Sequence, residues 1–64
     1  MRKGQKVRII ESEEPYFRKG DIATLIDKDG REWWGDFTNN GNNEVYGDGF
    51  WCIGAGGCEV TGGE

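Results

Sequence analysis

A turn, a short apolar run, a second turn and a pair of tryptophans follow one another between Lys19 and Trp34. The first turn is Lys19–Asp21, the apolar run is Ile22–Asp27, and the second turn is Asp27–Gly30. An Asp-Gly pair between apolar runs is a strong short-range signal for a β-hairpin, because tight hairpin turns need residues with positive φ. This stretch therefore predicts short antiparallel strands joined by tight turns.

The same alternation of apolar runs and turns covers the rest of the chain and predicts five strands. The ranges are Gln5–Glu11, Ile22–Asp27, Glu32–Thr38, a run that starts at Val45-Tyr46 and resumes at Phe50–Ile53, and Cys58–Thr61. No window keeps a helical period over two turns, so we expect at most a single 3₁₀ turn, at Gly54–Gly57. A small sheet buries its side chains best by closing on itself, which predicts an all-β, five-stranded barrel.

The length of the chain limits it to one domain. Its 64 residues predict a single unit over 1–64 with a core over about 5–61. Ordering costs ~1.5 kcal/mol per residue, so the few large apolar side chains must share one core. A chain this short cannot enclose a deep pocket, so we expect neither a small-molecule substrate nor a cofactor.

Alternation along the first predicted strand assigns its two faces. Val7 and Ile9 share one face, and Lys6, Arg8 and Ile10 share the other.

In the strand Ile22–Asp27 the apolar residues are nearly continuous, so we expect both faces to be covered. In the next strand, an inward Phe37 requires an inward Trp33 and an outward Trp34. A bulge at Gly35 would reverse the two tryptophans.

The charge is unevenly distributed along the chain. The net charge is −4 and the pI about 4.7, which argues against a domain that binds nucleic acid by neutralising phosphates. Six of the eight basic residues lie in the first 19 positions, and residues 32–64 contain none. Four of the basic residues near the N-terminus form a candidate phosphate-binding face, namely Arg2, Lys3, Lys6 and Arg8. A solvated strand face is the competing interpretation.

Cys52 and Cys58 are separated by six positions, and three interpretations stay open for them. They are two free thiols, a disulfide across the intervening loop, or part of a metal site. The metal site is disfavoured because the chain has no histidine and zinc needs four ligands. We therefore expect no metal.

The sequence contains no pattern of residues that indicates catalysis. The chain has no histidine, and its only serine, Ser12, has no base beside it. The adjacent Glu13 and Glu14 show no sign of the pocket that acid–base catalysis needs. Gly54–Gly57 lacks the lysine and the following helix of a phosphate-binding loop. We expect a binding protein that is not an enzyme.

No apolar run approaches the ~20 residues of a membrane span. The two basic residues near the N-terminus are not followed by the hydrophobic segment of a secretory signal. The default expectation is a cytoplasmic protein without a membrane partner.

Five motifs occur in the order in which an SH3 domain carries them. They are Phe17–Ile22, Leu25–Gly30, Trp33-Trp34, Gly49–Trp51 and Glu59-Val60. The chain thus resembles an SH3 domain over residues 17–60, with its diverging turn, Asp-Gly loop, double tryptophan, glycine-aromatic strand and closing strand. The resemblance implies an SH3-like β-barrel, with Trp33 as the one ligand contact that carries over by motif.

The chain departs from the family in the parts that bind proline-rich peptides. Val7–Ile10 stands where the family has its alanine-leucine-tyrosine-aspartate-tyrosine strand, and Cys52–Gly57 replaces the proline-serine-asparagine-tyrosine segment. The loop before the diverging turn is also shorter than the family's RT loop. The resemblance therefore weakens polyproline recognition, and the chain is more similar to bacterial or phage SH3-like barrels, including Tudor-like and KOW-like modules.

Aromatic residues are the leading candidates for a partner-binding surface, because an exposed tryptophan offers a large apolar face and one N–H donor. The candidates are Trp33, Trp34, Tyr16, Trp51 and Tyr46. Packing inside the barrel is the competing interpretation for each. The acidic run at Glu11, Glu13 and Glu14 is either solvated or a docking site for a basic partner.

Three functions remain open at this point. The first is a protein-interaction module, of the kind used by small phage or bacterial regulators of a host protein. The second is a KOW-like association with nucleic acid or nucleoprotein through the basic face. The third is a structural subunit of a larger assembly.

Overall fold

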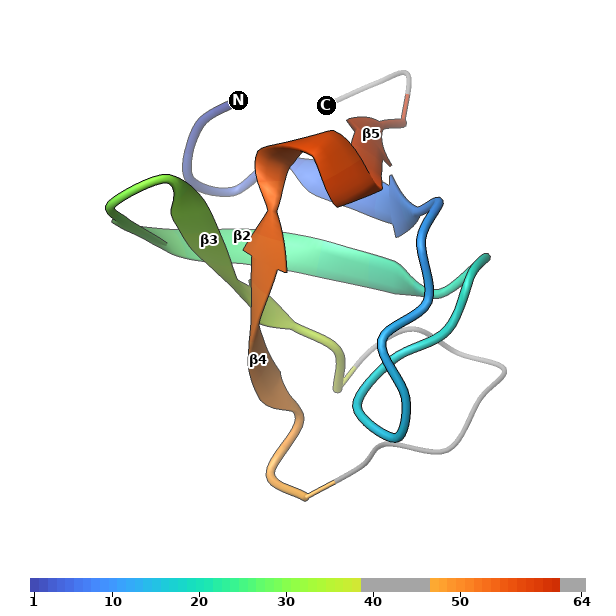
Figure 1. The fold of residues 1–64 in the computed structure, drawn as a ribbon. Helices are drawn as coiled ribbons and strands as arrows, with labels where there is room; N and C mark the ends of the chain where they lie inside the picture. The colour runs from blue at the N-terminus through green and yellow to red at the C-terminus, as the bar shows by residue number, and fades with distance from the viewer. Residues whose placement is uncertain (39–46, 62–64) are drawn as a thin grey trace.

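The chain forms one antiparallel sheet of five strands in a computed structural model that describes residues 1–38 and 47–61 (Figure 1). The elements are β1 (Lys6–Ile9), β2 (Ile22–Asp29), β3 (Glu32–Asp36), β4 (Phe50–Gly54), the 3₁₀ turn η1 (Ala55–Gly57) and β5 (Cys58–Val60). Within residues 1–38 and 47–61 the all-β prediction is confirmed, as are the five strands and the single 3₁₀ turn. The predicted strand start at Val45-Tyr46 lies outside the described residues.

The strand order is β4-β3-β2-β1-β5, so the first and last strands of the chain are neighbours. Among the described residues, β4 pairs with β3 and β5 pairs with β1, and the two end strands do not pair with each other. The sheet is therefore open, and the closed barrel expected from the sequence is not shown.

A turn at Lys19–Asp21 leads into β2, as predicted. The Asp21 carboxylate accepts a hydrogen bond from the backbone N–H of Arg18 at 3.0 Å, and the Gly20 N–H donates to the Ile9 carbonyl at 2.8 Å. Gly20 has a φ of 98°, a conformation that glycine adopts without steric cost. These bonds fix the end of β1 against the start of β2.

The β2–β3 hairpin turns later than the sequence predicted. β2 continues to Asp29, which pairs with Glu32, so Gly30 is the first residue of the turn and has a φ of 64°. The pairing shifts register between Leu25 and Asp27, which leaves Ile26 as the extra residue of a β-bulge.

The bulge also changes which residues of β2 are covered. Ala23 and Leu25 are buried, but Ile26 is 37% exposed, so the expectation that both faces are covered was wrong. The bulge lies in β2 rather than at Gly35, and β3 keeps its simple alternation. Trp33, Gly35 and Phe37 consequently face inward, as predicted.

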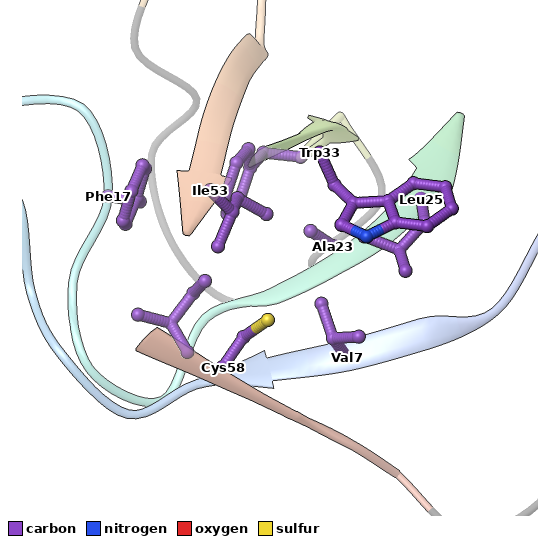
Figure 2. Close-up of a cluster of buried hydrophobic side chains, with 9 residues drawn as sticks. Val7, Phe17, Ala23, Leu25, Trp33, Ile53 and Cys58 are labelled. Atoms are coloured by element: carbon purple, nitrogen blue, oxygen red, sulfur yellow. The ribbon is translucent and has the colours of Figure 1, made fainter. Parts of the chain in front are cut away.

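One cluster of buried side chains holds the sheet together (Figure 2). Its members are Val7, Ile9, Phe17, Ala23, Leu25, Trp33, Phe37, Ile53 and Cys58. The cluster joins both ends of the sheet, since Ile53 comes from β4 and Cys58 from β5. Each fully buried aliphatic side chain contributes about 1.5–3 kcal/mol relative to exposure. The predicted alternation of β1 is confirmed, with Val7 and Ile9 both at 0% exposure.

Candidate functional site

The two adjacent tryptophans lie on opposite faces of β3. Trp33 is 7% exposed and sits among the core side chains in Figure 2, whereas Trp34 is 37% exposed. The Lys28 ammonium lies 5.9 Å from the centroid of the Trp33 ring. The prediction from strand alternation is confirmed. Trp33, which the family resemblance favoured as a ligand contact, is placed where most of its surface is covered.

An open groove brings together aromatic residues from three separate segments. We call it the aromatic groove; it is lined by Glu13, Tyr16, Phe17, Trp34, Trp51 and Cys52. Its volume is about 330 Å³. Three predicted partner-binding residues meet here, namely Tyr16, Trp34 and Trp51. Tyr46, also a candidate, lies outside the described residues.

Tyr16 reaches the groove from a tight turn between β1 and β2. The N–H of Glu13 donates to the Phe17 carbonyl at 2.8 Å, and the N–H of Tyr16 donates to the Glu13 carbonyl at 2.8 Å. The Phe17 ring is stacked on Phe37, with centroids 5.1 Å apart, and so anchors the turn to the core. The Tyr16 ring then meets the Trp51 ring, with centroids 4.5 Å apart and planes tilted by 43°.

The backbone at Gly47 lies close to the Trp51 ring. A side chain at Gly47 would place its Cβ 2.8 Å from Trp51 Cζ2, and Gly47 has a φ of 61°. Only glycine satisfies both conditions without strain. The Asp48 carboxylate accepts a hydrogen bond from the Phe50 N–H at 3.0 Å and fixes the start of β4. Gly47 thus leaves the space that the Trp51 ring occupies.

A second, smaller hollow adjoins the aromatic groove and is acidic. This acidic hollow has a volume of about 210 Å³ and is lined by Glu11, Ser12, Glu13, Phe17, Glu32, Ile53, Gly54 and Gly57. It shares Glu13 and Phe17 with the aromatic groove. The carboxylates of Glu11, Glu13 and Glu32 therefore lie at one end of the aromatic groove.

Strand pairing places further acids beside Trp34. Asp27 is opposite Trp34 across β2 and β3, and Cys52 is opposite Trp34 across β3 and β4. Asp29 is directly opposite Glu32, an arrangement of like charges that destabilises a sheet. Three carboxylates, those of Asp27, Asp29 and Glu32, therefore lie on the face that carries Trp34, and that of Asp27 is 3.2 Å from Lys3 Nζ.

The nearby carboxylates affect the acidity of the Cys52 thiol. Partial burial raises the pKa of its thiol, and the nearby carboxylates of Glu32 and Asp29 raise that pKa further. Burial also raises the pKa of Cys58, whose thiol lies 3.8 Å from the Gly54 carbonyl oxygen. Both cysteines are free thiols, so the disulfide interpretation is not supported. No three side chains of the described residues are grouped to hold a metal ion.

The four basic residues near the N-terminus do not converge on a site. The Arg8 guanidinium donates to the Glu59 carboxylate, with 2.9 Å between Nε and Oε2. Lys3 Nζ lies 3.2 Å from Asp27 Oδ1. Arg2 and Lys6 are exposed, with Lys6 on the outer side of β1. Two of the four charges are thus already balanced by acids of the same chain.

Sequence reasoning missed two residues of the aromatic groove, Phe17 and Cys52. Cys52 becomes a neighbour of Trp34 only through the β3–β4 register. Glu13 had been considered only as part of an acidic run. The adjacency of Tyr16 and Phe17 was the one local signal for this wall of the groove.

Comparison of the chain with protein-family models, with curated proteins and with solved structures finds no match. Within residues 1–38 and 47–61, no helix is long and apolar enough to cross a membrane. The function must therefore be inferred from the groove itself.

Proposed function

We propose that this protein is a non-enzymatic interaction module that binds a partner protein through the aromatic groove. The observation that carries the proposal is the meeting of Tyr16, Trp34 and Trp51 in one open groove. Tyr16 and Trp34 are 41% and 37% exposed, although their rings are large and apolar. Tyrosine and tryptophan are enriched among the residues that dominate binding energy at protein interfaces.

The proposal also covers the way in which the sheet is arranged. We infer that the open sheet is an SH3-like barrel, in which β1 lies between β2 and β5 and a 3₁₀ turn precedes the last strand. The strand order and the position of η1 support this inference. A cytoplasmic location and a role as a small phage or bacterial regulator remain predictions from the sequence.

Nucleic-acid binding through the basic face has weaker support than protein binding. Arg8 and Lys3 are paired with acids, and the net charge is −4. Phosphate binding depends on uncompensated Lys and Arg side chains. No observation favours a purely structural subunit over an interaction module.

Capture of a partner from cell lysate by the immobilised chain tests the proposal. We expect Trp34→Ala to abolish capture, because the substitution removes the largest exposed ring of the groove. The matched control is Ile10→Ala, since Ile10 is 39% exposed and does not line the groove. Urea unfolding of both variants shows whether the fold is intact. Equal capture by folded Trp34→Ala and wild-type protein would exclude the aromatic groove as the binding surface.

A further inference from the structure

The carboxylates of the chain differ in whether they have an intramolecular partner. Those that accept a hydrogen bond or form an ion pair are Glu14, Asp21, Asp27, Asp36, Asp48 and Glu59. Within residues 1–38 and 47–61, those with neither are Glu11, Glu13, Asp29 and Glu32. Three of these four line the acidic hollow, and Asp29 is opposite Glu32 in the sheet. The uncompensated negative charge is therefore gathered at one place.

This negative charge extends to the aromatic groove. Glu13 lines both the acidic hollow and the aromatic groove. The carboxylates of Glu32 and Asp29 raise the pKa of Cys52, a residue that also lines the aromatic groove. No lysine or arginine is among the described residues that line the two hollows. The groove therefore combines apolar rings with a negative charge that no basic residue of its lining neutralises.

The aromatic rings of the groove attract positive charge as well. The face of an aromatic ring is negative, and a cation within about 6 Å of the ring centroid is attracted to it. The chain itself shows this contact once, where the Lys28 ammonium lies over the Trp33 ring. Tyr16 and Trp34 leave part of their ring surface exposed in the groove. The rings and the carboxylates thus favour the same kind of ligand, a cation.

We propose that the aromatic groove binds an arginine side chain from a basic segment of the partner protein. The guanidinium stacks on the exposed ring of Trp34 and donates hydrogen bonds to the Glu13 carboxylate, while the acidic hollow attracts the flanking basic residues. Arginine suits the groove better than lysine, because its planar guanidinium stacks on aromatic faces and is more weakly hydrated than an ammonium group. The inference rests on the proposed function and identifies the partner by its chemistry.

Other occupants fit the charge of the site less well. A second copy of this chain would bring another net charge of −4 to the groove. A nucleic acid would bring phosphates, which the unpaired carboxylates repel. A neutral apolar segment would cover the rings but leave the carboxylates without a counter-charge.

Short blocked peptides that differ at one position test the proposal. The parent peptide consists of glycine and serine with a central arginine and a lysine on either side of it. Citrulline, which has the shape of arginine without its charge, replaces the arginine in a second peptide, and lysine replaces it in a third. NMR titration of the full chain follows the indole N–H signal that is missing from Trp34→Ala. We expect the affinity to fall about tenfold from arginine to citrulline, with lysine in between, because a cation–ring contact and a charged hydrogen bond are lost.

Glu13→Gln and Glu14→Gln form a matched pair of protein variants. Each removes one negative charge from the same turn, but only Glu13 lines the groove, and the Glu14 carboxylate is paired with Arg18. Glu13→Gln should weaken binding of the arginine peptide severalfold and leave the citrulline peptide unchanged, whereas Glu14→Gln should bind both as wild-type protein does. Trp34→Leu keeps an apolar side chain without the ring and should reduce the preference for arginine over citrulline. Urea unfolding shows that each variant is folded.

Four results would overturn arginine recognition. The first is equal affinity for the arginine and citrulline peptides, and the second is an unchanged Trp34 indole signal when the arginine peptide is added. The third is equal weakening by Glu13→Gln and Glu14→Gln, which would reduce the effect to net charge. The fourth is a dimer in sedimentation equilibrium that Trp34→Ala dissociates, which would make a second copy the occupant. The proposed function would survive the first three results if Trp34-dependent capture from lysate persists. Loss of that dependence in folded protein would remove the proposed function as well.

Discussion

Trp33 and Trp34 are neighbours in the chain but belong to different regions of the molecule. Trp33 packs with Leu25 and Ile53 in the core, where its burial stabilises the sheet. Trp34 lies outside with Asp27 and Cys52 on either side, where its ring lines an open groove. Because side chains alternate along β3, Trp33 has a stabilising role and its neighbour Trp34 has a candidate binding role. The inner face should govern the free energy of unfolding, and the outer face should govern binding.

The tryptophan pair gives the largest expected difference. Trp33→Ala should lower the free energy of unfolding by about 3–5 kcal/mol, because it removes a buried aromatic ring and leaves a cavity. Trp34→Ala should cost about 1 kcal/mol or less, as surface substitutions usually do. Urea unfolding followed by circular dichroism measures both values. Equal losses in the two variants would refute the division between the faces.

Gly35 tests how tightly the inner face of the sheet is packed. A Cβ at this position would lie 2.5 Å from Ile53 Cδ1 and 3.3 Å from Ala23 Cβ. Gly35→Ala should therefore cost about 1–3 kcal/mol through overpacking. Adding Ile53→Val removes the Cδ1 atom, so the double variant should be more stable than the sum of the single effects predicts. Strict additivity in that cycle would show that the contact does not limit packing.

The two cysteines should differ in reactivity, because one lies in the core and the other lies beside Trp34. Cys58 is buried in the core and Cys52 is partly exposed beside Trp34, so iodoacetamide should modify Cys52 first in the folded chain. Both thiols should react more slowly than in the unfolded chain at the same pH, because their raised pKa values lower the thiolate fraction. Mass spectrometry of the single Cys→Ser variants gives each rate. Faster modification of Cys58 would place it outside the core.

The same raised pKa values predict how stability depends on pH. The folded chain holds its thiol protons more tightly than the unfolded chain, whose cysteines have an ordinary pKa of 9.0. This contribution to stability is therefore complete below about pH 9 and is lost as the pH rises through the folded-state values. The decline above that pH should be smaller in Cys58→Ser than in wild-type protein, as urea unfolding at several pH values would show.

The smallest expected effect lies on the outer face, at the Asp29–Glu32 pair. Asp29→Asn removes a like-charge cross-strand contact and should raise stability by a few tenths of a kcal/mol at low salt. Glu59→Gln removes the partner of Arg8 and should change stability in the opposite direction. Both effects should fade in 1 M salt, where the screening length falls to about 3 Å. A gain from Asp29→Asn that persists in high salt would have to come from something other than charge.

The sequence alone determined the local features of this protein. Alternation put Val7 and Ile9 on one face of the first strand and, given an inward Phe37, put Trp33 inside and Trp34 outside. The glycine turns located the starts and ends of most strands, because turn chemistry and side-chain alternation depend only on adjacent residues. The end of β2 escaped prediction, since the bulge at Ile26 depends on how the partner strand pairs.

Only the tertiary structure decided which distant residues form the groove. The contact of Tyr16 with Trp51 and the pairing of Cys52 with Trp34 depend on how strands and turns fold over a shared core. The place of β4 at one end of the sheet likewise follows from strand order and is not encoded in any local pattern. Local interactions set each strand and its faces, whereas the site arises from long-range contacts that form only when hydrophobic burial packs the strands and turns around a shared core.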